Sequence, residues 1–209
     1  MKNRHYSLEW QQPLWLATLM AASVAFSLGL ACAVPLAAFA ALGALTLDRR
    51  MGLVIIIGIV AANQIIGFTV QHYPLDAATA AWTPPFLFVG ITATLAAFWT
   101  KRRCAGLHPM LAVLATFVAA FASYEGGFFL ISLLTRSGLY AYAPSIVQRI
   151  FETNALAFGG LLLIRRIAMA LRKPAVKIRN AIPPVADDLH PRLNYDLVDA
   201  KAPGRAPGR

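Results

Sequence analysis

Few residues of this chain are able to do chemistry, and most of these interrupt long apolar segments. Asn63, Gln64 and Glu125 lie well inside such segments, and Arg149 and Glu152 lie close to the start of another. A charged side chain in hydrocarbon costs on the order of 3 kcal/mol, so residues of this kind usually face a cavity or a partner. The spacing of Arg149 and Glu152, three positions apart, permits an ion pair on one helix face.

These polar residues and several aromatic ones fall toward one side of the membrane in the topology derived below. Together they predict a polar and aromatic pocket for a small molecule. Each also has a structural interpretation, as interfacial aromatic residues, as an ion pair near the headgroups, or as hydrogen bonds between helices. The predicted binding residues are Asn63, Gln64, His72, Trp82, Tyr124, Glu125, Tyr140, Arg149 and Glu152.

No arrangement of these residues indicates catalysis. The sequence has no G-x-S-x-G, no H-E-x-x-H and no Walker A motif, so it predicts neither an enzyme nor ATP hydrolysis by the chain itself. An intramembrane hydrolase built on Glu125, Glu152 and His72 stays a weaker alternative. Cys32 and Cys104 lack the spacing of a metal site, and no cofactor is expected.

The elements that position these residues are predicted to be membrane-spanning helices. Only 13% of the residues are charged, against roughly 25% in soluble domains. The first apolar block, 14–47, would be roughly 50 Å long as one helix, which exceeds the hydrocarbon thickness of roughly 30 Å, so we expect a break near Pro35. The predicted spans are 14–31, 35–47, 51–70, 85–100, 108–134 and 146–164, with polar loops at 71–84 and 135–144.

The basic residues predict the orientation of this bundle. The chain has 19 Lys and Arg against 9 Asp and Glu, and in a six-span topology all but Arg136 and Arg149 fall on the side of the termini. Both termini are therefore expected in the cytoplasm. A five-span alternative, with 14–47 as one tilted helix, would place Arg49 and Arg50 outside. Because the charges mark the ends of spans, nucleic-acid binding is not expected. The predicted membrane domain is 1–173, followed by a basic, Pro-rich and disordered cytoplasmic tail at 174–209.

This layout resembles the substrate-binding S component of energy-coupling factor (ECF) transporters, which are proteins of similar size with six spans. The best-matching stretch is Val34–Phe68, VPLAAFAALGALTLDRRMGLVIIIGIVAANQIIGF. In that family the first helix often carries small residues four apart that contact the coupling subunit. Ala17, Ala21 and Ala25 have this spacing, in ATLMAASVA.

The resemblance implies uptake of a vitamin or related micronutrient across the cell inner membrane. The implied partners are a membrane coupling subunit and two ATPase subunits, besides membrane lipid. Were the substrate a corrinoid, Cys32 or His72 would be candidate cobalt ligands. A membrane scaffold whose polar residues only hold helices together is the alternative from a different class.

Overall fold

The computed structural model describes residues 11–30, 34–136 and 142–171. The helices lie in the first of two compact units, Met1–Ala168; the second, Met169–Arg209, is described only over 169–171, where the last helix ends. The predicted tail at 174–209 lies outside the described residues. In chain order the helices are α2 (Gln11–Gly29), α3 (Leu36–Thr46), α4 (Arg49–Thr69), α5 (Ala77–Ala80), α6 (Thr83–Arg103), α7 (Pro109–Thr135) and α8 (Pro144–Leu171).

The described residues form helices without strands, which confirms the predicted all-helical class. Five helices, α2, α4, α6, α7 and α8, are long and apolar enough to cross a membrane. Proline and capping residues set several of the boundaries. Asp48 accepts a hydrogen bond from the Met51 backbone N–H at 2.8 Å, and Pro109 stands in the first turn of α7, where its missing N–H costs nothing. The predicted loop at 71–84 contains one further helical turn, α5.

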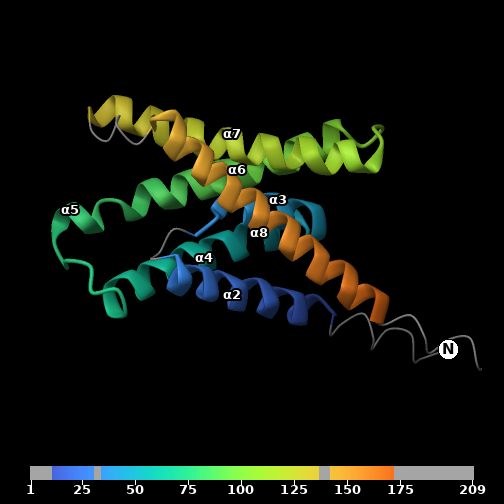
Figure 1. The fold of residues 1–209 in the computed structure, drawn as a ribbon, viewed down its shortest axis with the longest axis horizontal. Coiled ribbons are helices and arrows are strands. Elements are labelled where there is room, and N and C mark those ends of the chain that lie inside the picture. The colour runs from blue at the N-terminus through green and yellow to red at the C-terminus, as the bar shows by residue number, and fades with distance from the viewer. Residues whose placement is uncertain (1–10, 31–33, 137–141, 172–209) are drawn as a thin grey trace, which may run out of the picture. The chain divides into compact units, whose positions relative to one another are not determined.

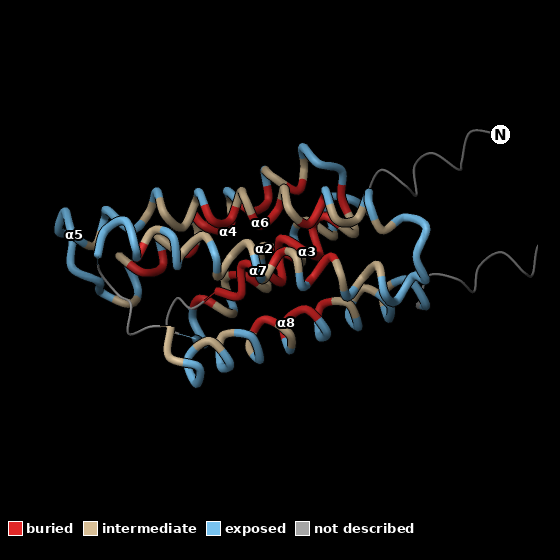
Figure 2. Tube along the Cα trace, turned by 90° about the horizontal axis from the view of Figure 1, so that it is seen from above, coloured by how far each residue is buried: buried red, intermediate tan, exposed pale blue. Residues whose placement is uncertain are grey.

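The short helix α3 lies at the centre of the bundle. It contacts α4, α6 and α7, and its residues from Leu36 to Ala44 are all buried (Figure 2). A helix of 11 residues is only roughly 16 Å long, about half the hydrocarbon thickness of a bilayer. Its alanine-rich sequence suits this position, because small side chains let neighbouring backbones approach closely.

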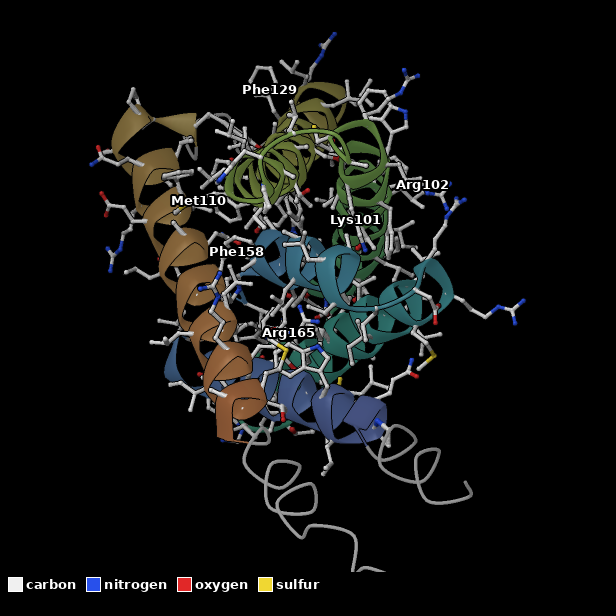
Figure 3. The ribbon with its side chains drawn as sticks, turned by 90° about the vertical axis from the view of Figure 1, so that its right-hand side faces the viewer. Lys101, Arg102, Met110, Phe129, Phe158 and Arg165 are labelled. Carbon is white, nitrogen blue, oxygen red and sulfur yellow. The ribbon has the colours of Figure 1, made fainter. Side chains whose placement is uncertain are left out.

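α3 nevertheless returns the chain from the end where α2 stops to the end where α4 begins. As a result α2, α4 and α7 run in one direction and α3, α6 and α8 in the other (Figure 1). The turn after α3, the turn after α6 and the last turns of α8 meet at one end of the bundle, and we call it the basic end. Its basic residues are Arg49, Arg50, Lys101, Arg102, Arg103, Arg165 and Arg166, and Figure 3 views this end.

Side chains from neighbouring helices hold both ends of α3. The Asn154 side-chain oxygen of α8 accepts a hydrogen bond from the Ala38 N–H at 3.2 Å. At the other end, the Lys101 ammonium of α6 donates to the Ala44 carbonyl at 2.6 Å. The Ala38 N–H also donates to the Pro35 carbonyl at 3.0 Å, so Asn154 adds a second acceptor in the first turn of α3. Lys101 supplies a donor in the last turn, where carbonyl groups lack helical partners.

An aromatic cluster packs α8 against α7. The ring centroids of Phe117 and Phe158 lie 4.8 Å apart in a stacked arrangement, and those of Phe121 and Phe151 lie 5.1 Å apart, edge to face. Aromatic pairs at these separations stabilise the contact beyond the area they bury. The opposite side of α8 is exposed along its length (Figure 2).

Candidate functional site

A pocket of about 850 Å³ opens at the end of the bundle opposite the basic end. We call it the end pocket. It lies where α2 ends and α8 begins, and α6 and α7 close it with one aromatic ring each. Its volume is in the range of sites for single small molecules, roughly 300–1,000 Å³. The lining residues are Gly29, Leu30, Val34, Phe86, Tyr124, Ser145, Ile146, Arg149, Ile150, Thr153 and Asn154.

The start of α3 adjoins the end pocket. Val34 lines it, and so does Asn154, whose side chain also accepts from the Ala38 N–H. Asn154 is 2% exposed, and its amide nitrogen donates to the Ile150 carbonyl at 2.9 Å. Asn154 therefore gives the pocket a polar residue whose side-chain oxygen and nitrogen are both already hydrogen-bonded.

Arg149 supplies a full positive charge to the same pocket. Its side chain is exposed, and no ion pair joins it to a carboxylate within the described part of the chain. The pair with Glu152 that the spacing permits does not form. Glu152 instead accepts a hydrogen bond from the Gln148 side chain at 2.8 Å. The guanidinium group of Arg149 is thus available to bind a carboxylate or phosphate in bidentate fashion.

Tyr124 and Phe86 give the pocket an aromatic wall. The Phe128 ring lies between them and contacts both edge to face, with centroid distances of 5.2 Å to Tyr124 and 5.1 Å to Phe86. This packing fixes both rings in position. A flat apolar ligand would therefore meet a rigid surface on α6 and α7, in the same pocket that the arginine of α8 lines.

Of the predicted binding residues that the structure describes, Tyr124 and Arg149 line the end pocket. Asn63 is buried and bonded to Ser27, with 3.1 Å between the Ser27 hydroxyl and the Asn63 side-chain oxygen. This contact joins α2 to α4. It agrees with the structural interpretation of Asn63, a hydrogen bond between helices. Gln64 is half-buried on the same helix and does not line the pocket.

His72 and Trp82 lie in the segment between α4 and α6. His72 is exposed, with a left-handed backbone conformation (φ 54°) in the turn that ends α4. Trp82 is 41% exposed and precedes the first residue of α6. Neither lines the end pocket. Tyr140 lies outside the described residues.

Glu125 is half-buried on α7 but does not line the end pocket. No described residue donates a hydrogen bond to its buried Oε1 atom. Tyr142, between α7 and α8, is close enough for Glu125 to affect its ionisation. Burial raises the pKa of the Tyr142 phenol above its ordinary value, the Glu125 charge acts in the same direction, and a hydrogen bond with Ser132 opposes both.

Two glycines, Gly126 and Gly127, follow Glu125 on α7. At Gly127 the backbone lies close to α6, because a Cβ atom built there would lie 2.9 Å from a Val89 methyl carbon. Gly126 faces open space, since nothing lies within 4 Å of such an atom. Neither glycine contributes to the pocket lining.

No cluster of three or more His, Cys, Asp or Glu side chains able to hold a metal ion occurs in the described ranges. Cys32, one of the two predicted cobalt ligands, lies outside them. His72, the other, is exposed in its turn.

Asn154, Phe86, Ser145 and Val34 line the pocket but were not among the predicted binding residues. Asn154 could have been found from the sequence, because a polar residue inside an apolar span usually faces the bundle interior or a cavity. The other three carry no such signal, because they differ in no way from ordinary helix-end residues. Only the packing of α3, α6 and α8 brings them to one cavity.

Ala17, Ala21 and Ala25 are exposed on one face of α2. They therefore do not serve internal packing of the bundle, and the strip that they form is free to contact something else.

Neither the known protein families, nor characterised proteins, nor solved structures give a match to this chain. The functional argument accordingly depends on the pocket and the helices themselves.

Proposed function

We propose that this protein captures a small anion-bearing molecule, of the vitamin or micronutrient class, from the extracytoplasmic side of the membrane for import. The observation that carries the proposal is the end pocket, which is lined by Tyr124, Phe86 and an Arg149 that forms no ion pair with any described residue. One cation and two rings match a ligand with a carboxylate or phosphate on a flat or apolar body.

The direction of capture follows from the charges. The end of α2 and the start of α8, which line the end pocket, lie away from the basic end (Figure 1), and basic residues at span ends are retained in the cytoplasm. In this topology six segments cross the cell inner membrane, with the short helix α3 as the second. Both termini are then cytoplasmic, and the pocket opens to the outside.

Import against a gradient needs an energy source that this chain does not show. The ECF-type arrangement supplies one, through a membrane coupling subunit and two ATPases. Ala17, Ala21 and Ala25 support this part of the proposal, because small exposed residues four apart allow a second helix to approach the backbone of α2 closely.

A ligand screen on the purified protein tests the proposal. The full chain is heated in detergent with and without each member of a panel of vitamins and related micronutrients, including corrinoids. A ligand that binds the folded state stabilises it and so raises the unfolding temperature. At a ligand concentration a hundredfold above Kd, the stabilisation is about 2.7 kcal/mol. We expect an increase with at least one anionic member. An unchanged unfolding temperature across the whole panel contradicts substrate capture and favours the scaffold alternative.

A further inference from the structure

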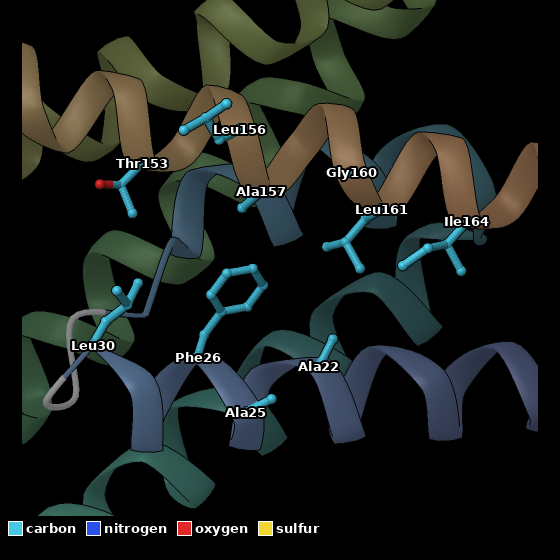
Figure 4. Close-up of a pocket in the computed structure, with 10 residues that line it drawn as sticks. All are labelled: Ala22, Ala25, Phe26, Leu30, Thr153, Leu156, Ala157, Gly160, Leu161 and Ile164. Atoms are coloured by element: carbon cyan, nitrogen blue, oxygen red, sulfur yellow. The ribbon is translucent and has the colours of Figure 1, made fainter.

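An apolar groove of about 530 Å³ separates α2 from α8. The two helices meet near the basic end, where the Arg165 guanidinium lies 6.0 Å from the centre of the Trp15 ring. Beyond this contact the groove opens, and in Figure 4 the Phe26 ring projects from α2 into the space between the helices. The lining residues are Ala22, Ala25, Phe26, Leu30, Thr153, Leu156, Ala157, Gly160, Leu161 and Ile164.

The groove continues into the end pocket. Leu30 and Thr153 line both. Along α8, the distance from Arg149 in the pocket to Ile164 at the far end of the groove is 15 residues, or roughly 22 Å. The cavity as a whole thus has a cation near one end and hydrocarbon along the rest of its length.

The groove offers no free polar partner. Thr153 is its one polar lining residue, and the hydroxyl of that residue already donates to the Arg149 carbonyl at 2.9 Å. Ser23 and Ser27 of α2 are buried on another face of the helix. An occupant of the groove must therefore be apolar, since an unpaired polar group would lose its hydration without compensation.

The dimensions favour a single hydrocarbon chain. Ala22, Ala25, Ala157 and Gly160 provide little side-chain bulk between the two helices, and the volume lies within the range of single-ligand sites, roughly 300–1,000 Å³. Leu30, Leu156 and Ile164 are exposed at the edges of the groove, at 39%, 78% and 48%. A chain can therefore enter sideways from the bilayer while its polar end reaches the pocket.

We infer that the ligand is a single-chain amphiphile taken from the extracytoplasmic side, with an anionic group at Arg149 and a hydrocarbon part in the groove between α2 and α8. This inference rests on the proposed function and specifies its substrate class. The positive charge of Arg149 is complementary to the anionic group of the ligand. The residues that line both cavities, Leu30 and Thr153, indicate that the hydrocarbon part runs from the pocket into the groove.

The test uses the full chain in nanodiscs of phosphatidylcholine, with three probes. Dodecyl phosphate carries both parts of the ligand, inorganic phosphate carries only the anion, and dodecanol carries only the chain. We expect dodecyl phosphate to bind at least tenfold more tightly than either of the others. Equal affinities of dodecyl phosphate and inorganic phosphate overturn the inference.

A matched pair of variants locates the chain in the groove. Gly160 lines the groove and Gly159 does not, and a Cβ atom at either position meets nothing within 4 Å. Gly160→Leu fills the groove without displacing its neighbours and should weaken dodecyl phosphate binding at least tenfold. Gly159→Leu adds the same bulk outside and should bind as the unchanged protein does. Equal binding by the two variants overturns the inference.

One further outcome separates this inference from the proposed function. If a small anionic vitamin binds but Gly160→Leu alters the affinity for no probe, the groove is not a ligand site and substrate capture stands. If no compound of either set binds, both proposals fail. Loss of dodecyl phosphate binding in nanodiscs that contain phosphatidylglycerol would identify a bilayer phospholipid as the occupant and overturn the assignment of an external amphiphile.

Discussion

Asn154 of α8 accepts a hydrogen bond from the backbone N–H of Ala38 in α3, over a distance of 3.2 Å. The same asparagine lines the end pocket. One side chain therefore both bonds the first turn of the buried half-length helix and forms part of the candidate binding surface. Stability of the bundle and the shape of the pocket are linked at this position.

Asn154→Ala should destabilise the protein by about 1 kcal/mol, because it removes one hydrogen bond of the Ala38 N–H, whose other acceptor is the Pro35 carbonyl. Thermal unfolding in detergent measures the change. Gln148→Ala, on the exposed side of the same helix, is the control and should change stability little. Equal unfolding temperatures for the two variants would show that the bond to Ala38 contributes nothing.

Lys101→Met should destabilise the protein by about 1.5–3 kcal/mol, the usual value of a hydrogen bond from a charged donor. The substitution keeps the apolar stem and removes the ammonium group that donates to Ala44 O in the last turn of α3. Arg102→Met, at the next and exposed position, is the matched control. Unfolding in a denaturant series compares the two, and an effect as large in the control would mean that loss of charge at this end, rather than the bond to α3, is responsible.

The sequence predicted the helices well because their ends carry strong local signals. Pro109 starts α7, Asp48 precedes α4, and the basic residues Lys101 to Arg103 close α6. The predicted range 35–47 agrees closely with α3. The last helix runs longer than its predicted range of 146–164, because the first basic residues, Arg165 and Arg166, do not end the helix; they extend from it at the basic end.

The faces of the helices were harder to predict than their ends. Helical pitch places Arg149, Glu152 and Thr153 on one broad arc, but it does not say where the neighbouring helix lies. In the structure Arg149 and Thr153 line the pocket, while Glu152 bonds to Gln148 outside it. Which part of an arc faces inward depends on long-range packing, here of α8 against α7 and α3, and no local pattern encodes that packing.

Ala21→Leu should leave the isolated protein as stable as before and prevent its co-purification with a membrane coupling subunit. Ala21 is exposed on α2, so the added bulk enlarges only the outer surface where the partner helix would approach. Ala61→Leu places the same bulk on an exposed position of α4 and should have no effect on the complex. Normal complex formation by Ala21→Leu would exclude this face of α2 as the contact surface.

Cysteine labelling checks the orientation. In a chain with Cys32 and Cys104 replaced by Ala, Ser145→Cys places a thiol at the end pocket, and Arg102→Cys places one at the basic end; both positions are exposed. A membrane-impermeant maleimide added to intact cells should modify the first and not the second. Labelling of position 102 in intact cells would mean that the bundle is inserted the other way round.

The affinity of Arg149 variants for an anionic ligand tests the central claim most directly. Each bond from a charged donor contributes roughly 1.5–3 kcal/mol, so Arg149→Gln should weaken equilibrium binding at least tenfold. Arg149→Lys keeps the charge without the planar guanidinium group, so its affinity should fall between those of the unchanged protein and Arg149→Gln. Arg136→Gln removes a positive charge from the same end outside the pocket lining and should bind normally. If Arg149→Gln binds the ligand as tightly as Arg136→Gln does, the end pocket is not the binding site.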